Sequence, residues 1–166
     1  MQTRTVETGM GNDFPFIPGF LPALERSPEA QEARMRLDRT IRNGTLGTRA
    51  RAMIALAVAH QSGFDYCIWA QSNIARGVGL TGEEMMLASV GTALDRREGA
   101  IVRLAREIAR SGTFSEQEVR KLPQDPILTR AEMLEVVANV AAAVIDNYII
   151  QSVAPDNARA THARRV

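Results

Sequence analysis

Apolar positions recur along most of this chain at intervals of three and four residues, which is the spacing of an amphipathic helix. No segment alternates apolar and polar residues between hairpin turns, so we expect no significant sheet. The pattern predicts an all-α protein, a helical bundle of about seven helices.

Residues that favour helix starts divide the chain into these elements. Ser27-Pro28-Glu29 supplies an N-cap, a proline at the first helical position and an acid in the first turn. The segments that open at Thr81, Ser115 and Thr129 each carry a glutamate three positions later, which is the capping-box pattern. Asp95 opens a further helix in a similar way.

The centre of the chain predicts an antiparallel helical hairpin. Residues 48–62 are nearly continuously apolar around Met53 to Val58, which indicates a buried helix. Gly63 ends this helix, and a second helix is expected over residues 65–78. Such a short connection requires the two helices to run in opposite directions.

Prolines suggest the limits of the helical domain. Residues 1–26 contain Pro15, Pro18 and Pro22, and we expect an extended arm there. Its apolar side chains should pack on the body or on a neighbouring subunit; they are Phe14, Phe16, Phe20 and Leu21. The helical domain is predicted over residues 27–155, with Pro155 as its stop, followed by a flexible tail over 156–166.

The last predicted helix, over residues 129–153, has little polar surface. A helix that is apolar all round must be covered on several sides, so we expect a homo-oligomer. Two polar residues of this helix, Asn139 and Asn147, are expected to be buried and hydrogen-bonded across a helix or subunit boundary.

Composition narrows the functional classes. The 166 residues suit one domain, and a net charge of +1 gives no case for nucleic acid or membrane binding. There is neither a signal-peptide pattern nor a run of about 18 apolar residues, so a cytoplasmic location is expected. A single cysteine, Cys67, excludes an internal disulfide, and with only two histidines we expect no metal and no cofactor.

Residues 52–72, AMIALAVAHQSGFDYCIWAQS, followed by a helix that ends in Gly79-Leu80, resemble the core of the alkylhydroperoxidase-like (AhpD-like), or carboxymuconolactone decarboxylase, family. The resemblance extends over about residues 45–153. The family signature is a glutamate, eleven residues, Cys-x-x-Cys, three residues and a histidine. It implies the AhpD-like helical fold and an oligomer, a trimer or a hexamer.

The signature is largely replaced in this chain. Its glutamate falls on Ala52, its first cysteine on Phe64, its second on Cys67 and its histidine on Gln71. In the family the second cysteine attacks a peroxide and the first resolves the sulfenic acid as a disulfide. With Phe64 in place of the resolving cysteine, reduction of a hydroperoxide would need an external thiol.

The residues that could act are therefore few. Cys67 is the candidate nucleophile, because a helix start favours its thiolate, or else it is an inert core residue, because burial opposes charge. Gln71 lies one turn from it, and His60 could approach it across the hairpin or be structural. Aromatic side chains near Cys67 suit either core packing or a pocket wall; they are Phe64, Tyr66 and Trp69.

Three functions remain open. The first is a peroxidase-related protein that uses Cys67 alone for thiol-dependent reduction of a hydroperoxide. The second is a non-catalytic family member that binds a small ligand or a partner. The third is a lyase of the carboxymuconolactone decarboxylase type, for which the chain offers no evident general acid or base beyond His60.

Overall fold

A computed structural model describes residues 19–111 and 127–162, which contain seven helices and no strand. The helices are α1 (Phe20–Leu24), α2 (Pro28–Arg42), α3 (Thr48–Ser62), α4 (Asp65–Gly77), α5 (Gly82–Ser89), α6 (Arg96–Ser111) and α8 (Arg130–His162). The all-α prediction is confirmed. The short helix predicted from Ser115, and the residues Phe14 and Phe16, lie outside the described residues.

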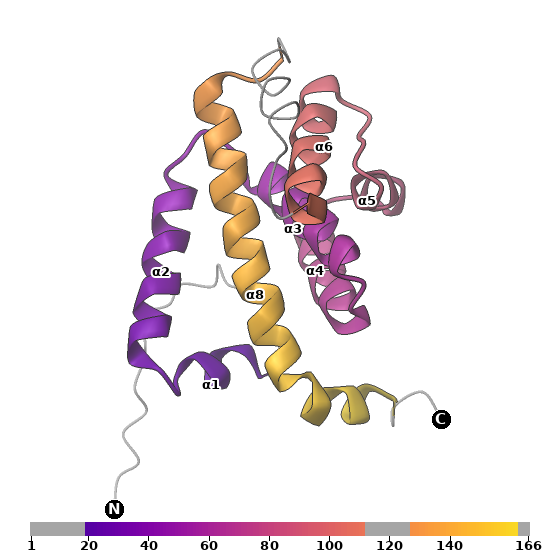
Figure 1. The fold of residues 1–166 in the computed structure, drawn as a ribbon. Helices are drawn as coiled ribbons and strands as arrows, with labels where there is room; N and C mark the ends of the chain where they lie inside the picture. The colour runs from indigo at the N-terminus through magenta and orange to yellow at the C-terminus, as the bar shows by residue number, and fades with distance from the viewer. Residues whose placement is uncertain (1–18, 112–126, 163–166) are drawn as a thin grey trace, which may run out of the picture.

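The long helix α8 crosses the molecule, with α2 on one side of it and α3 to α6 on the other (Figure 1). The central element is α3, which packs against α4, α5, α6 and α8. In contrast, α2 packs mainly on α8 and α1. The space between α2 and the α3–α4 hairpin is therefore less completely filled than the rest of the bundle.

The burial of α3 explains its unusual composition. Residues on all sides of this helix are buried, including Met53, Ile54, Leu56 and Ala57, so it shows almost no amphipathic character. Gly63 ends it with φ of 67°, a left-handed conformation that glycine adopts without the steric cost other residues meet. Phe64 then leads directly into α4, so the predicted hairpin is present.

The predicted helix starts form as expected. The backbone N–H of Ala30 donates to the Ser27 hydroxyl over 3.3 Å, so Ser27 caps α2. Thr81 and Glu84 form a reciprocal capping box at the start of α5. A second capping box precedes α8: the backbone N–H of Thr129 donates to the Glu132 carboxylate, and the backbone N–H of Glu132 donates to the Thr129 hydroxyl.

Both ends of the domain differ from the prediction. Residues 20–24 form the short helix α1 rather than an extended arm, because Phe20 and Leu24 are drawn into a core cluster with Ile150 of α8. At the other end α8 continues through Pro155 to His162 instead of stopping. Proline lacks an N–H and kinks a helix without always ending it, and the last part of α8 changes direction (Figure 1).

The loop between α2 and α3 is held by α8. The Glu135 carboxylate accepts hydrogen bonds from the backbone N–H groups of Thr45, at 2.7 Å, and Leu46, at 3.0 Å. A Cβ atom on Gly44 would lie 2.6 Å from Glu135 Oε2. The close approach of this carboxylate to the backbone therefore depends on glycine at position 44.

Candidate ligand-binding site

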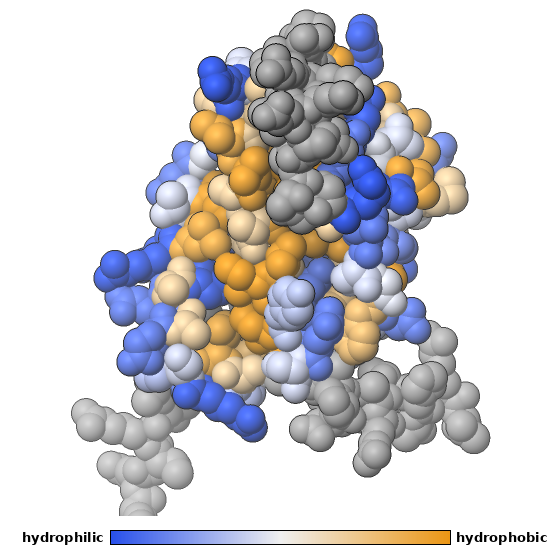
Figure 2. All heavy atoms as spheres, viewed as in Figure 1, coloured by the Kyte–Doolittle hydropathy of each residue, from blue (hydrophilic) through white to orange (hydrophobic). Residues whose placement is uncertain are grey.

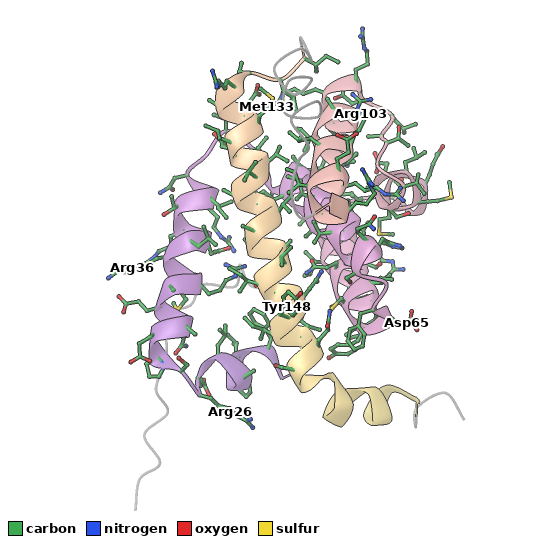
Figure 3. All side chains as sticks on the ribbon, in the orientation of Figure 1. Arg26, Arg36, Asp65, Arg103, Met133 and Tyr148 are labelled. Carbon is green, nitrogen blue, oxygen red and sulfur yellow. The ribbon has the colours of Figure 1, made fainter. Side chains whose placement is uncertain are left out.

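A half-open cavity of about 450 Å³ lies between α2, α3, α4 and α8. Side chains of α2 and α8 project into the space between these two helices (Figure 3). The volume is within the range of about 300–1,000 Å³ that is common for small-molecule sites. The cavity exists because α2 packs along α8 but not closely against the α3–α4 hairpin.

One wall of the cavity is an ion-pair network between α2 and α8. The buried Arg34 guanidinium donates to both carboxylate oxygens of Asp146, over 2.6 and 2.7 Å. Asp38 accepts from Arg42 over 2.6 Å and lies 3.7 Å from Arg34. Burial raises the pKa of the Asp146 carboxyl, and the paired Arg34 opposes that rise. The two carboxylates of the cavity wall are thus both engaged by arginines.

A third arginine of the wall, Arg51, has a different environment. Its guanidinium donates to the carbonyl of Leu46 and to the hydroxyl of Thr48, each over 3.0 Å. Both acceptors are neutral, and among the described residues no carboxylate forms a salt bridge with Arg51. Partial burial and the nearby positive charge of Arg42 lower the pKa of Arg51, and the negative charge of Asp38 opposes this change in part. Three arginines and two aspartates line the cavity, so its lining carries one excess positive charge.

The remaining lining combines two amides with apolar side chains. Gln71 and Asn139 are both buried and both border the cavity. The amide nitrogen of Asn139 donates to the Glu135 carbonyl over 2.7 Å, which leaves its oxygen as an acceptor. Apolar surface comes mainly from Ile41, Ala52, Ala55, Ile74 and Val78. Such a site can bind an organic molecule that carries one negatively charged group.

Cys67 does not line this cavity. It is fully buried in a cluster formed with α1 and α8, and its thiol donates to the Asn147 carbonyl over 3.6 Å. Burial raises the pKa of Cys67 to about 11, and a hydrogen bond with Gln151 opposes the rise only in part. Burial is the largest influence on this thiol, which is protonated at neutral pH.

The other predicted site residues are divided between separate places. His60 is exposed, and its pKa is lowered by desolvation and by Arg106 of α6, while Cys67 contacts α8. Tyr66 stacks on Trp69 with ring centroids 5.3 Å apart, and Trp69 remains 42% exposed. Phe64 packs on the cluster that contains Cys67. Of the six predicted residues, Gln71 lines the cavity and the other five do not.

The charged residues of the cavity were not predicted from the sequence. Arg34, Asp38 and Arg42 are spaced by four, so they share one face of α2, but this spacing is also typical of solvated ion pairs. The sequence gives no sign that Arg34 pairs with Asp146, which is 112 positions away. Burial of Asn139 and Asn147 was predicted correctly, and Asn139 is one of the polar groups in the cavity. The expected hydrogen bonds across a helix boundary are not what is observed: Asn139 donates within α8, to the Glu135 carbonyl, and the buried side-chain oxygen of Asn147 has no partner among the described residues.

Comparison with known proteins agrees with the helical frame. A model of the carboxymuconolactone decarboxylase family matches residues 28–110, which is half of the chain. The chain therefore belongs to this family. Among curated proteins, none matches the sequence significantly.

A solved structure shows the same fold. ATU0492 from Agrobacterium tumefaciens is a protein of unknown function with the provisional name of an antioxidant defence protein, AhpD. It superimposes with a TM-score of 0.59 at 21% sequence identity, over 78% of this chain and 90% of that one. The AhpD-like helical fold predicted from the sequence is thereby confirmed.

Two positions of the family signature border the cavity in this chain. Ala52 and Gln71, which stand where the signature has glutamate and histidine, both line it. Neither side chain can exchange a proton at neutral pH. Cys67 and Phe64, at the two cysteine positions, lie instead in the core cluster with α1. The structure thus separates the surviving cysteine from the cavity.

Proposed function

We propose that this protein is a family member that binds a small organic carboxylate in the α2–α3–α4–α8 cavity. The observation that carries the proposal is the partly buried guanidinium of Arg51, which faces the cavity beside Arg42 with neutral hydrogen-bond partners. A carboxylate at this position would supply Arg51 with a charged acceptor and would offset the excess positive charge of the cavity lining.

The rest of the cavity suits the remainder of such a molecule. The amides of Gln71 and Asn139 can hydrogen-bond a hydroxyl or carbonyl group of the ligand. The wall of Ile41, Ile74 and Val78 can cover its apolar part. The name of the family also refers to a reaction of a compound that bears a carboxyl group.

Peroxide reduction through Cys67 has weaker support. The thiolate is the reacting form of cysteine, and burial strongly disfavours it at position 67. Phe64 cannot resolve a sulfenic acid, and Gln71 cannot transfer a proton. A lyase reaction in the cavity has no evident general acid or base, because Asp38 and Asp146 are both bound to arginines. Binding is therefore the function that the geometry favours.

Isothermal titration calorimetry tests the binding of a carboxylate. Benzoate and succinate should bind, while their uncharged amides, benzamide and succinamide, should not. Replacing Arg51 by Gln should weaken binding by about tenfold to a hundredfold, the range for losing a hydrogen bond to a charged group. Arg36→Gln removes the same charge from the exposed face of α2 and should leave the affinity unchanged. Equal binding of acids and amides, or full affinity of Arg51→Gln, would contradict the proposal.

A second assay addresses the cysteine. The wild type and a Cys67→Ala variant should consume cumene hydroperoxide at the same background rate in the presence of dithiothreitol. Faster consumption by the wild type would restore Cys67 as the reactive group and would favour the peroxidase-related function.

A further inference from the structure

The helix α8 presents an exposed apolar stripe on the side that faces away from the core. The stripe consists of Leu134, Val137, Ala141, Ile145 and Tyr148, all of which are exposed. The intervals between them are three and four residues, so they fall within an arc of about 80° on the helix. They extend over about 21 Å of its length.

This stripe is a large apolar surface for so small a domain. Leu134 is 66% exposed and Tyr148 is 70% exposed, while Val137 and Ile145 are 43% and 40% exposed. Figure 2 shows apolar residues gathered along the middle of this face, over α8. The opposite side of α8 is already buried in the core through Val136, Val140, Ala143 and Ile150. Packing in the core therefore explains the apolar residues on the inner side of α8 but not those on its outer side.

The positions of the stripe are symmetric about Ala141. Val137 and Ile145 lie four residues before and after it, and Leu134 and Tyr148 lie seven residues before and after it. When two such helices cross in opposite directions at Ala141, Val137 of one copy meets Ile145 of the other. Leu134 then meets Tyr148. The small side chain of Ala141 allows the two backbones to approach closely at the crossing point.

We propose that this stripe is a two-fold interface, in which α8 of one copy packs antiparallel on α8 of a second copy. A surface that pairs with itself is the requirement for an isologous contact. The proposal is independent of the ligand-binding function. It requires an even number of chains, as in a dimer or in the hexamer that the family resemblance implies, and it disagrees with a simple trimer.

A lipid surface is the main alternative occupant. The segment Arg130–Ser152 has the length and composition of a membrane-spanning helix, a property shared by core helices of other proteins. Helices that lie on membranes usually carry basic residues beside the apolar face. After its first residue, the charged residues of this segment are Glu132, Glu135 and Asp146, all acidic. This charge pattern favours a second copy over an anionic membrane.

Charged substitutions test both the surface and its direction. The wild type should sediment at an even multiple of 18.2 kDa at micromolar concentration. Val137→Lys and Ile145→Glu should each reduce that mass at least twofold, because each places a charge in the apolar contact. Mixing the two variants should restore the assembly, since an antiparallel crossing brings the introduced lysine of one copy beside the introduced glutamate of the other. Leu94→Glu is the matched control, because Leu94 is 67% exposed and lies outside α8.

Each other result overturns the proposal. A wild type of 18.2 kDa, or of three chains, excludes the two-fold contact. An assembly that both variants leave intact places the interface elsewhere. Variants that dissociate but do not recover on mixing exclude the antiparallel register. A single chain that co-sediments with phosphatidylcholine–phosphatidylglycerol vesicles, and loses this binding in Ile145→Glu, assigns the stripe to a lipid surface.

Discussion

The buried thiol of Cys67 provides a quantitative test of the site assignment. Its pKa of about 11 lies two units above the reference value of 9.0, because burial disfavours the charged form. At neutral pH the thiolate population is thus about a hundredfold lower than that of an unperturbed cysteine. Since Cys67 is also 0% exposed, its alkylation in the folded protein should be slower than in the unfolded chain by at least about a hundredfold.

Alkylation by iodoacetamide, followed by mass spectrometry, measures this ratio directly. The same protein in concentrated urea at the same pH is the reference, because the chain contains a single cysteine. A ratio below about tenfold, or an alkylation midpoint at or below the ordinary cysteine pKa of about 8.5, would refute the assignment of Cys67 to the core. Either result would return this residue to the role of a reactive nucleophile.

The same pKa predicts a dependence of stability on pH. A raised pKa in the folded state means that the protonated thiol stabilises the fold fully below the unfolded-state pKa, near 9. The contribution is then lost as the pH rises toward the folded-state pKa, near 11. Between about pH 8 and about pH 10 the loss should reach about 1.3 kcal/mol. Urea denaturation of the wild type and of Cys67→Ala isolates this contribution, because the variant lacks the titrating group.

Three further predictions concern the fold and are measured by urea denaturation. Arg34→Met leaves the buried Asp146 without its partner and should lower the free energy of unfolding by about 3–5 kcal/mol. The control Arg36→Met, on the exposed face of α2, should change the free energy of unfolding by less than about 0.5 kcal/mol. Gly44→Ala places Cβ against the Glu135 carboxylate and should lower the free energy of unfolding by about 1–3 kcal/mol. Its control, Gly77→Ala, has no atom within 4 Å of the added Cβ and should not destabilise the protein. Thr81→Ala breaks the capping box of α5 and should cost about 1 kcal/mol, whereas Thr81→Ser should retain most of it. If a variant and its control lose the same free energy of unfolding, the corresponding contact does not stabilise the fold as predicted.

Arg36 and Tyr148 lie on different parts of the surface (Figure 3). Arg36 points away from α8 on the outer side of α2, so its replacement removes charge without touching the cavity. Tyr148 lies on α8 itself and belongs to the stripe for which a second copy is proposed.

Local interactions explain why several features of the fold were predictable from the sequence. Helix starts at Ser27, Thr81 and Thr129, and the stop at Gly63, depend on contacts within a few residues, so their residue types predicted them correctly. The apolar character of residues 48–62 likewise predicted a buried central helix. Pro155 was misleading, because a proline lowers the stability of a helix without deciding alone whether the chain continues through it.

Which side chains meet depends on how the helices pack, and local residue types do not specify that packing. The sequence left open whether Cys67 is buried, and the packing of α1 and α8 over α4 buries it and raises the pKa of its thiol. The cavity depends on where α2 lies relative to α3, which residue periodicity does not specify. Arg34 and Asp146 are far apart in the chain, and the pairing of their charges follows from the packing of α2 on α8.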